Sequence, residues 1–343
     1  MKHFRLSFVV TVVCLLLAGI WGARNGMGVA PAVLIAAVLG VLEVSLSFDN
    51  AVVNASVLKE MEAKWQQIFL TVGILIAVFG MRLIFPIAIV AVATGLGFGD
   101  VAAMALERPE EYSRHLGGAH AGIAAFGGMF LLLVFFAFLF DDDRELHWLG
   151  KAEEKLARMG KLESIEVMLA LLTLFGCYLW MPLDDATRLT VLSAGVAGVI
   201  LFIAVSSLDS LFAPESEGAA AVATAKRSGI AGFLYLEVLD ASFSFDGVIG
   251  AFAITRDVVV IMLGLGIGAM FVRSLTVYLV RKGTLDQYVF LEHGAHYAIG
   301  SLAVIMLAGI VMHIPEAVTG LIGVAFIALA LVSSVRYRKK KGR

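Results

Sequence analysis

The sequence predicts an all-α fold, a polytopic membrane helical bundle of about ten spans that contains inverted three-helix repeats. The first observation is composition: the 343 residues are 60% hydrophobic and only 16% charged, too few charges for a soluble protein of this size. The second is that the apolar residues form runs long enough to cross a bilayer. The third is a set of polar motifs that occurs twice, in the same order, inside those runs.

Apolar windows of about 18–25 residues mark the candidate spans. The first window follows Lys2 and Arg5, as in a signal peptide, and its removal would leave nine spans. Trp21 and Arg24 stand where a cleavage site needs small residues, which favours a retained helix. The ten predicted spans are about residues 6–22, 29–54, 68–97, 119–140, 165–181, 189–213, 229–254, 258–280, 296–313 and 316–335.

The positive charges between the spans predict the orientation of the bundle. With the N-terminus in the cytoplasm, 19 of the 26 Lys and Arg residues fall in cytoplasmic segments, five in outer segments and two, Arg82 and Arg273, within spans. Because cytoplasmic loops carry an excess of Lys and Arg, this distribution predicts that both termini are cytoplasmic. The charged segment 141–164 reads as a solvated linker, with a surface helix as the alternative.

Three helices of the first half have counterparts in the second half. The order is an acidic helix, an arginine-bearing helix and a helix with a Gly-Ala-His motif. The matching segments are Glu43–Asn50 with Asp240–Gly247, Arg82 with Arg273, and Gly118–His120 with Gly294–His296. Because the two acidic helices are five spans apart in the predicted topology, they run in opposite directions, as in the inverted repeats of many secondary transporters.

The predicted domain organisation is a single integral membrane domain over residues 1–343. Repeat one covers about 29–140 and repeat two about 229–313, and the spans near 165–181 and 189–213 join them. In transporters built this way, the binding site lies at the interface of the repeats, near the middle of the bilayer.

Carboxylates inside the spans predict a cation site. Each ionised group costs roughly 2.5–3.5 kcal/mol to insert, so its presence there indicates a function. One helix face of the first segment carries Glu43, Ser47, Asn50 and Asn54, and the second segment repeats that spacing. Asp49 and Asp246 lie off these faces. Either each helix has two polar faces or it unwinds at the Ser-Phe-Asp motif, and the glycines beside Asp246 favour such a break.

The predicted metal ligands are all oxygen donors, which suit Mg²⁺, Ca²⁺ or Mn²⁺ rather than zinc or copper(I). The six ligands are Glu43, Asp49, Asn50, Glu237, Asp240 and Asp246. The supporting residues are Ser47, Ser244, Arg82 and Arg273. Five acids and two arginines leave about three negative charges, which one divalent ion and a proton would balance. The alternative is that the acids only pair with the arginines and hold the helices together.

Three histidines, His120, His293 and His296, are candidates for a proton relay, because imidazole titrates near neutral pH. His293 and His296 also have a spacing that suits a metal ion, and helix–helix hydrogen bonds are the structural alternative. No protease, P-loop or dinucleotide motif occurs where it could work, so an enzyme is not predicted. The glycine-rich run 264–269 lies inside a span and predicts close helix packing.

These motifs resemble the TerC integral membrane family, most closely a branch labelled a domain of unknown function, and the plan is similar to that of the lysine-exporter-like superfamily. The resemblance covers about residues 30–313 and is carried by the Glu43–Asn50 and Glu237–Thr255 segments, the two arginine helices and Leu291–Gly300. It implies a bacterial inner-membrane protein tied to tellurium resistance or manganese export. The cation ligands that it implies are Glu43, Asp49, Asp240 and Asp246. Gly247 departs from the family pattern, in which a small polar residue often follows the second aspartate.

The sequence therefore predicts a transporter of divalent cations, with manganese efflux favoured over transport of Ca²⁺ or Mg²⁺. Export of a dication against an inside-negative potential costs about 4.6 kcal/mol per 100 mV, and we expect inward protons to drive it. One alternative is a non-transporting membrane protein for tellurium or metal stress response or assembly. Another is an intramembrane metal enzyme that uses His293 and His296. The expected partners are the metal ion and the lipid bilayer, with no nucleic acid and no permanently bound cofactor; the oligomeric state stays open.

Overall fold

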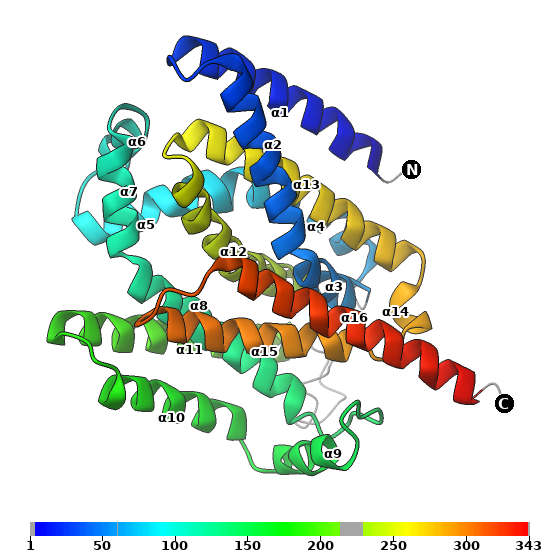
Figure 1. Cartoon of the computed structure of the whole chain (residues 1–343). Helices are drawn as coiled ribbons and strands as arrows, with labels where there is room; N and C mark the ends of the chain where they lie inside the picture. Colours follow the sequence, from blue (N-terminus) through cyan, green and yellow to red (C-terminus); the bar gives the residue numbers. More distant parts are fainter. Residues whose placement is uncertain (1–3, 60, 213–228, 342–343) are drawn as a thin grey trace.

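The structure is a computed structural model that describes residues 4–59, 61–212 and 229–341, and those ranges contain helices and no strand (Figure 1). The helices of the first half are α1 (Arg5–Arg24), α2 (Val29–Leu46), α3 (Phe48–Leu58), α4 (Ala63–Leu75), the π-helix η2 (Ile76–Ile84), α5 (Phe85–Thr94), α6 (Phe98–Glu107), α7 (Pro109–Gly118), α8 (His120–Leu139), α9 (Lys151–Ala157) and the 3₁₀-helix η3 (Arg158–Lys161). The others are α10 (Ile165–Trp180), α11 (Asp185–Phe212), α12 (Gly229–Ile254), α13 (Val258–Arg281), α14 (Thr284–Gln287), α15 (Leu291–Gly309) and α16 (Glu316–Lys341).

Within the described residues, seven helices have the length and composition to cross a membrane: α1, α2, η2 with α5, α8, α11, α13 and α16. An eighth span results if the bent pair of α9–η3 and α10 counts as one. Large apolar side chains are exposed on such helices, for example Leu16 at 62% and Val41 at 68%. The chain is therefore a multi-pass membrane protein. Each of the ten predicted spans overlaps a helix, but a count of ten spans stays a prediction.

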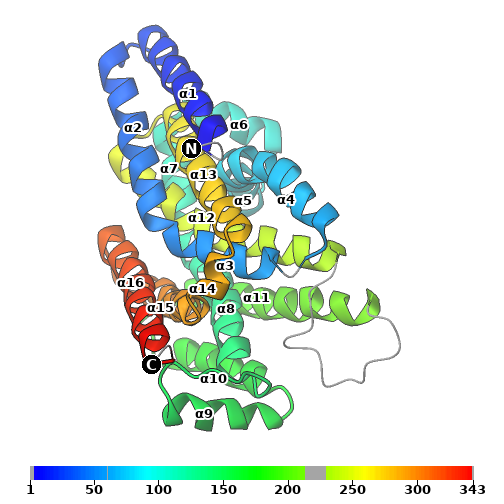
Figure 2. The ribbon, with the colours of Figure 1, turned by 90° about the vertical axis from the view of Figure 1, so that its right-hand side faces the viewer.

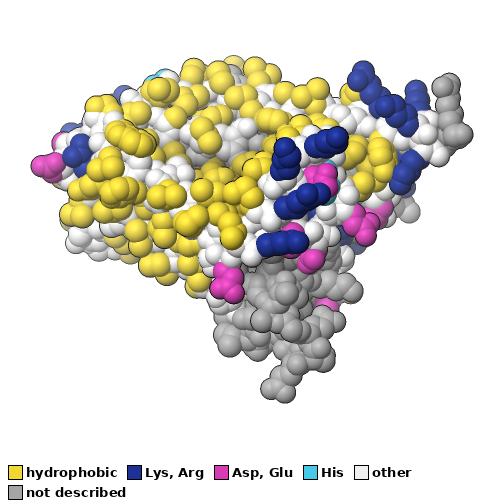
Figure 3. All heavy atoms as spheres, turned by 90° about the horizontal axis from the view of Figure 1, so that it is seen from below, with side chains coloured by type: hydrophobic (Ala, Val, Ile, Leu, Met, Phe, Trp, Pro, Cys, Tyr) yellow, Lys and Arg dark blue, Asp and Glu magenta, His cyan; other side chains and the backbone are white. Residues whose placement is uncertain are grey.

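The arrangement of the termini, the edge helices and the surface charges can be followed in the figures. Both termini lie toward one end, whereas the turns after α12 and α15 lie toward the other (Figure 1). Helices α1 and α2 form one edge of the molecule, and α9 and α10 form the opposite edge (Figure 2). On the face shown in Figure 3, apolar side chains spread widely and Lys and Arg side chains gather in one part. A broad apolar surface with localised charge is what a bilayer protein needs.

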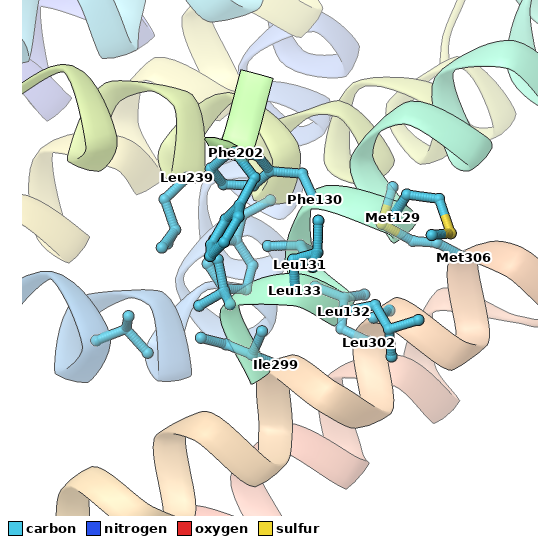
Figure 4. Packing of buried hydrophobic residues seen from close by; sticks show 14 of the residues in the cluster. Met129, Phe130, Leu131, Leu132, Leu133, Phe202, Leu239, Ile299, Leu302 and Met306 are labelled. Carbon is cyan, nitrogen blue, oxygen red and sulfur yellow. The ribbon is translucent and has the colours of Figure 1, made fainter. Parts of the chain in front are cut away.

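A large group of buried apolar residues lies around α8, which is apolar on all sides. The consecutive side chains from Met129 to Leu133 are all buried (Figure 4). They pack with Phe202 of α11, Leu239 of α12, and Ile299 and Met306 of α15. A helix that is apolar all round belongs in the interior of a bundle. By packing there, α8 fixes the positions of α12 and α15.

Helix α1 packs against both α2 and α13. The Ser7 hydroxyl is buried, donates to the Met270 carbonyl at 2.8 Å and lies 2.7 Å from the Ser274 hydroxyl. Near the other end of α1, the Trp21 ring N–H donates to the Asp257 carboxylate at 2.8 Å. Polar contacts therefore tie both ends of α1 to the α13 region, and the helix is part of the bundle.

The predicted break of the acidic helix occurs in the first acidic segment only. Helix α2 ends at Leu46, Ser47 has φ −101° and ψ 21°, and α3 begins at Phe48. Helix α12 instead continues without interruption, so the break predicted in the second segment is wrong. Gly247 has a different use there: a Cβ at this position would lie 2.9 Å from Glu43 Oε2. Its missing side chain allows close approach and does not bend the helix.

Candidate cation site

Glu43 of α2 lies in a narrow slot and is held through one of its two oxygens. Its Oε1 accepts hydrogen bonds from the Arg82 guanidinium and from the Ser47 hydroxyl, the latter at 3.2 Å. A Cβ on Gly268 of α13 would lie 2.3 Å from Glu43 Cβ. The glycine-rich run therefore provides the close helix packing that the sequence predicts. The other oxygen, Oε2, lies next to Gly247.

Arg82 is placed by η2, a π-helix that the sequence did not predict. Its side chain is buried, and its guanidinium donates to the Ala77 carbonyl as well as to Glu43. π-Helical turns are rare and occur frequently at functional sites. The available sequence signal was the arginine itself, which stands alone among apolar residues of its span.

Asp240 and Glu237 of α12 form a second group of buried acids. The Asn50 side-chain amide of α3 donates to Asp240 Oδ1 at 2.9 Å. Glu237 Oε1 lies 3.5 Å from the Arg273 guanidinium of α13. That guanidinium also stacks on the Phe69 ring, with 3.6 Å between its central carbon and the ring centroid. The two acidic segments, far apart in sequence, therefore meet at Asn50 and Asp240.

Several buried oxygen atoms in α3 and α12 have no hydrogen-bond partner among the described residues. They are Asn50 Oδ1, Asn54 Oδ1, Glu237 Oε2, Asp240 Oδ2 and Ser244 Oγ. An unpaired buried acceptor costs roughly 1–3 kcal/mol, and more when it is charged. Buried charged groups avoid this cost by pairing or by coordinating a metal ion. This set of atoms is therefore chemically suited to hold a cation.

The buried charges of the described site do not balance. The side chain of Asp246, a predicted ligand on α12, lies outside the described part of the structure. Within this site the described buried acids are Glu43, Asp49, Glu237 and Asp240, and the buried arginines are Arg82 and Arg273. Four acids against two arginines leave a net charge of −2 when all are ionised. One divalent cation would neutralise this charge.

A cavity of about 120 Å³ lies beside Glu43 and Asp49. At its buried end it is lined by these two acids and Ser47, at the break between α2 and α3. At its exposed end are His120, which begins α8, and His313, which follows α15. A site for one water needs roughly 10–15 Å³, so the cavity has room for several waters or a partly hydrated ion. Two predicted ligands and one predicted relay histidine therefore share one cavity.

The acids of this region do not form a closed ligand set. Among the side chains that the structure describes, the one group of three potential ligands within 4.8 Å of one another is Asp141, Asp142 and Asp143. These follow α8, and the last two are exposed. Asp141 Oδ1 accepts from the Asp143 amide at 3.2 Å, and burial raises the pKa of the Asp141 carboxyl. The candidate site is instead an open row of oxygens on α2, α3 and α12.

His293 and His296 are not among the residues that line the cavity, and they contact the 141–164 segment and α8. His293 Nε2 lies 3.6 Å from Glu153 Oε1, and the His296 ring stacks on an aromatic ring of α8 at 4.0 Å. Glu153 of α9 is fully buried and lies 2.9 Å from the Arg144 guanidinium. The prediction of a solvated linker is therefore wrong, because buried charges fold this segment into α9 and η3 against α15.

Sequence reasoning missed His313 and Met306, which also line the cavity. A signal for His313 was present, because it is the last residue of the predicted span 296–313, at the same end of the bundle as His120. Met306 gave no signal, since a methionine in an apolar run is indistinguishable from a packing residue. Of the three predicted relay histidines, the structure thus brings His120 to the cavity and the other two elsewhere.

A protein-family model matches residues 48–341, and the chain therefore belongs to that family, DUF475, which is described as a protein of unknown function. The match begins at α3, so it contains Asn50 and Asp240 and leaves out Glu43. No curated protein and no solved structure is significantly similar to the chain. The resemblance to the TerC family stays a prediction.

Proposed function

We propose that this member of the DUF475 family transports divalent cations across the membrane, with export of manganese from the cytoplasm as the favoured reaction. The observation that carries the proposal is the row of buried oxygen atoms that have no hydrogen-bond partner among the described residues, in a site whose described acids and arginines sum to −2 when all are ionised. Such a row is costly in a membrane unless it serves an ion. Carboxylate and amide oxygens suit a hard or borderline dication such as Mn²⁺.

The proposed route follows one face of α12. Glu237, Asp240, Ser244 and Gly247 are spaced by three or four residues, so they share that face. Ten residues of α-helix span about 15 Å, which is half of a typical hydrocarbon core. The cavity beside Gly247 would be the open end of the route. The contacts of Asp240 with Asn50 and of Glu237 with Arg273 would close the other end.

We further propose a topology of ten spans with inverted repeats and cytoplasmic termini. The shared end of the two termini is consistent with this orientation (Figure 1). It would place His313, in the turn after α15, on the outer side, so the cavity would open outward. Each repeat would then contain one buried acid–arginine pair, Glu43–Arg82 and Glu237–Arg273, with Glu237 one helical turn before Asp240, the residue that aligns with Glu43.

The spare oxygens argue against a purely structural role for the acids. Arg82 engages Glu43 through Oε1, and Arg273 lies near Glu237 through Oε1. Glu237 Oε2 and Asp240 Oδ2 remain without hydrogen-bond partners among the described residues. A protein that used these acids only to join helices would leave fewer buried oxygens unpaired. Likewise, His293 and His296 are engaged with the 141–164 segment and α8, so no observation favours the metal-enzyme alternative.

Uptake of Mn²⁺ into proteoliposomes that contain a metal-sensing dye tests the proposal. We expect the wild-type protein to carry Mn²⁺ and Asp240→Asn to lose at least about tenfold in rate, since divalent affinity depends on the charge of the oxygen ligands. Asp185→Asn is the matched control, because this carboxylate is fully exposed at the start of α11. Equal uptake by folded wild-type and Asp240→Asn proteins would contradict the proposed route.

Coupling to protons is tested in the same vesicles. A pH gradient that drives protons against the Mn²⁺ flux should accelerate uptake, because the free energy of proton entry would offset the cost of dication export. A rate of Mn²⁺ uptake that is independent of the gradient would remove the antiport element and leave the transport proposal in place.

A further inference from the structure

We infer that His120 and His313 form a second metal position, at the exposed end of the cavity, that selects transition-metal dications over Ca²⁺ and Mg²⁺. This inference deepens the proposed function and rests on it, because the ion is taken to follow the route proposed above. Both imidazoles line the cavity whose buried end carries Glu43 and Asp49. A cation on its way between the acids and the outer side would pass them.

The structure brings the two histidines to one cavity, from the start of α8 and from the turn after α15. His120 is the first residue of α8, and its Cε1 would lie 3.9 Å from a Cβ on Gly309 of α15. His313 follows four residues after Gly309, where the chain leaves α15. Among the described residues, no group of three candidate ligands lies within 4.8 Å of one another at this position. The proposed position is therefore a pair of imidazoles, completed by water.

The chemistry of the lining differs between the two ends of the cavity. At the buried end the donors are carboxylate and hydroxyl oxygens, from Glu43, Asp49 and Ser47. At the exposed end the imidazoles are accompanied by the thioether of Met312, which is 56% exposed. Imidazole nitrogen binds Mn²⁺, Co²⁺, Ni²⁺ or Zn²⁺, whereas Ca²⁺ and Mg²⁺ require oxygen. The oxygen donors at the buried end would bind both the transition-metal dications and Ca²⁺ or Mg²⁺. The imidazoles at the exposed end would favour the transition-metal dications.

The fields of the two neighbouring helix ends oppose each other here. Helix α8 begins at His120 and presents its positive N-terminal end, while α15 presents its negative C-terminal end near His313. Because these partial charges act in opposite directions, the side chains decide what binds. Neutral imidazole is the form that coordinates a metal ion.

The test uses Co²⁺ as a spectroscopic probe of the purified, full-length protein in detergent. In the wild type we expect Co²⁺ to bind with visible absorption bands typical of nitrogen ligation. In H120Q/H313Q, which removes both proposed ligands, we expect Co²⁺ binding at this position and its absorption bands to be lost. His115→Gln is the matched control, because His115 lies on α7 and is not among the cavity residues. Unchanged bands and affinity in the double variant would overturn the inference.

Competition in proteoliposomes provides the second readout. Ca²⁺ at a large excess should inhibit Mn²⁺ uptake weakly in the wild type and at least about tenfold more strongly in H120Q/H313Q, because the variant has lost its nitrogen donors. If the double variant fails to fold, the single variants H120Q and H313Q replace it, each with a smaller expected effect. Equal inhibition in wild type and variants would contradict the proposed selectivity.

The failures of the two proposals give different results. The proposed function fails if the wild type carries no Mn²⁺ and if Asp240→Asn binds Co²⁺ as the wild type does. This result holds whether or not His120 and His313 bind a metal ion. If Asp240→Asn abolishes Mn²⁺ uptake but H120Q/H313Q has wild-type selectivity and Co²⁺ spectra, the histidine position fails and the proposed function stands.

Discussion

The two acidic segments of the molecule have the same motif and different backbones. In the first, the chain leaves the helix at Ser47, between Glu43 and Asp49. In the second, α12 passes through the corresponding Ser244-Phe245-Asp246 without interruption. The Ser-Phe-Asp motif is therefore insufficient to break a helix. The surroundings of the two motifs differ: Ser47 donates its hydroxyl to Glu43 one turn earlier, whereas Gly247 of α12 lies next to the Glu43 carboxylate.

The ion pairs of the two segments also differ, in how closely the acid and the arginine approach each other. Glu43 and Arg82 are in direct hydrogen-bond contact, and both side chains are almost completely buried. Glu237 and Arg273 are 3.5 Å apart, and Arg273 also stacks on Phe69. The first pair is thus a fixed contact, and the second is a looser one that shares its arginine with an aromatic ring. We expect the second pair to be the more easily rearranged of the two.

Double-mutant cycles on the two pairs should give the largest difference. We expect a coupling energy of about 3 kcal/mol between Glu43 and Arg82 and one nearer about 1 kcal/mol between Glu237 and Arg273, because direct buried pairs couple most strongly. The cycles combine E43Q with R82Q and E237Q with R273Q, and the free energy of unfolding in detergent is measured. A larger coupling for the second pair would reverse the comparison.

Substitution of Gly268 tests the slot that holds Glu43. A Cβ there would lie 2.3 Å from Glu43 Cβ, so Gly268→Ala should cost about 1–3 kcal/mol through overpacking. Gly266→Ala is the control on the same helix, since its Cβ would meet Val78 at an ordinary 3.4 Å. For the control we expect unchanged stability or a gain of up to about 1 kcal/mol from helix propensity. Equal losses in the two variants would show that the slot is not tight.

Gly247→Ala should separate stability from transport. On the continuous helix α12, alanine improves helix propensity by up to about 1 kcal/mol. Its Cβ would also lie 2.9 Å from Glu43 Oε2, and the carboxylate would have to move. We therefore expect unfolding to be unaffected or slightly harder, while Mn²⁺ uptake falls several-fold. Lower stability with normal uptake would show that Gly247 serves the backbone and not Glu43.

The sequence predicted those features that depend on local composition. The apolar runs located helices, and the carboxylates inside them identified the residues that are buried at the interface of α2–α3 with α12. It did not predict η2, the continuity of α12 or the fold of the 141–164 segment. Residues of all three elements contact partners distant in the chain: Arg82 and Gly247 lie next to Glu43, and Glu153 lies next to His293. Hydrophobic periodicity carries no information about such partners.

Thermal unfolding of the purified protein with increasing Mn²⁺ tests the central claim most directly. If the buried oxygens bind the ion, Mn²⁺ at about 100 times its dissociation constant should stabilise the wild type by about 2.7 kcal/mol. We expect this stabilisation to be absent in Asp240→Asn and retained in Asp185→Asn, with smaller effects of Ca²⁺ and Mg²⁺ on the wild type. Stability of the wild type that is independent of all three ions, or equal stabilisation of wild type and Asp240→Asn by Mn²⁺, would contradict the account.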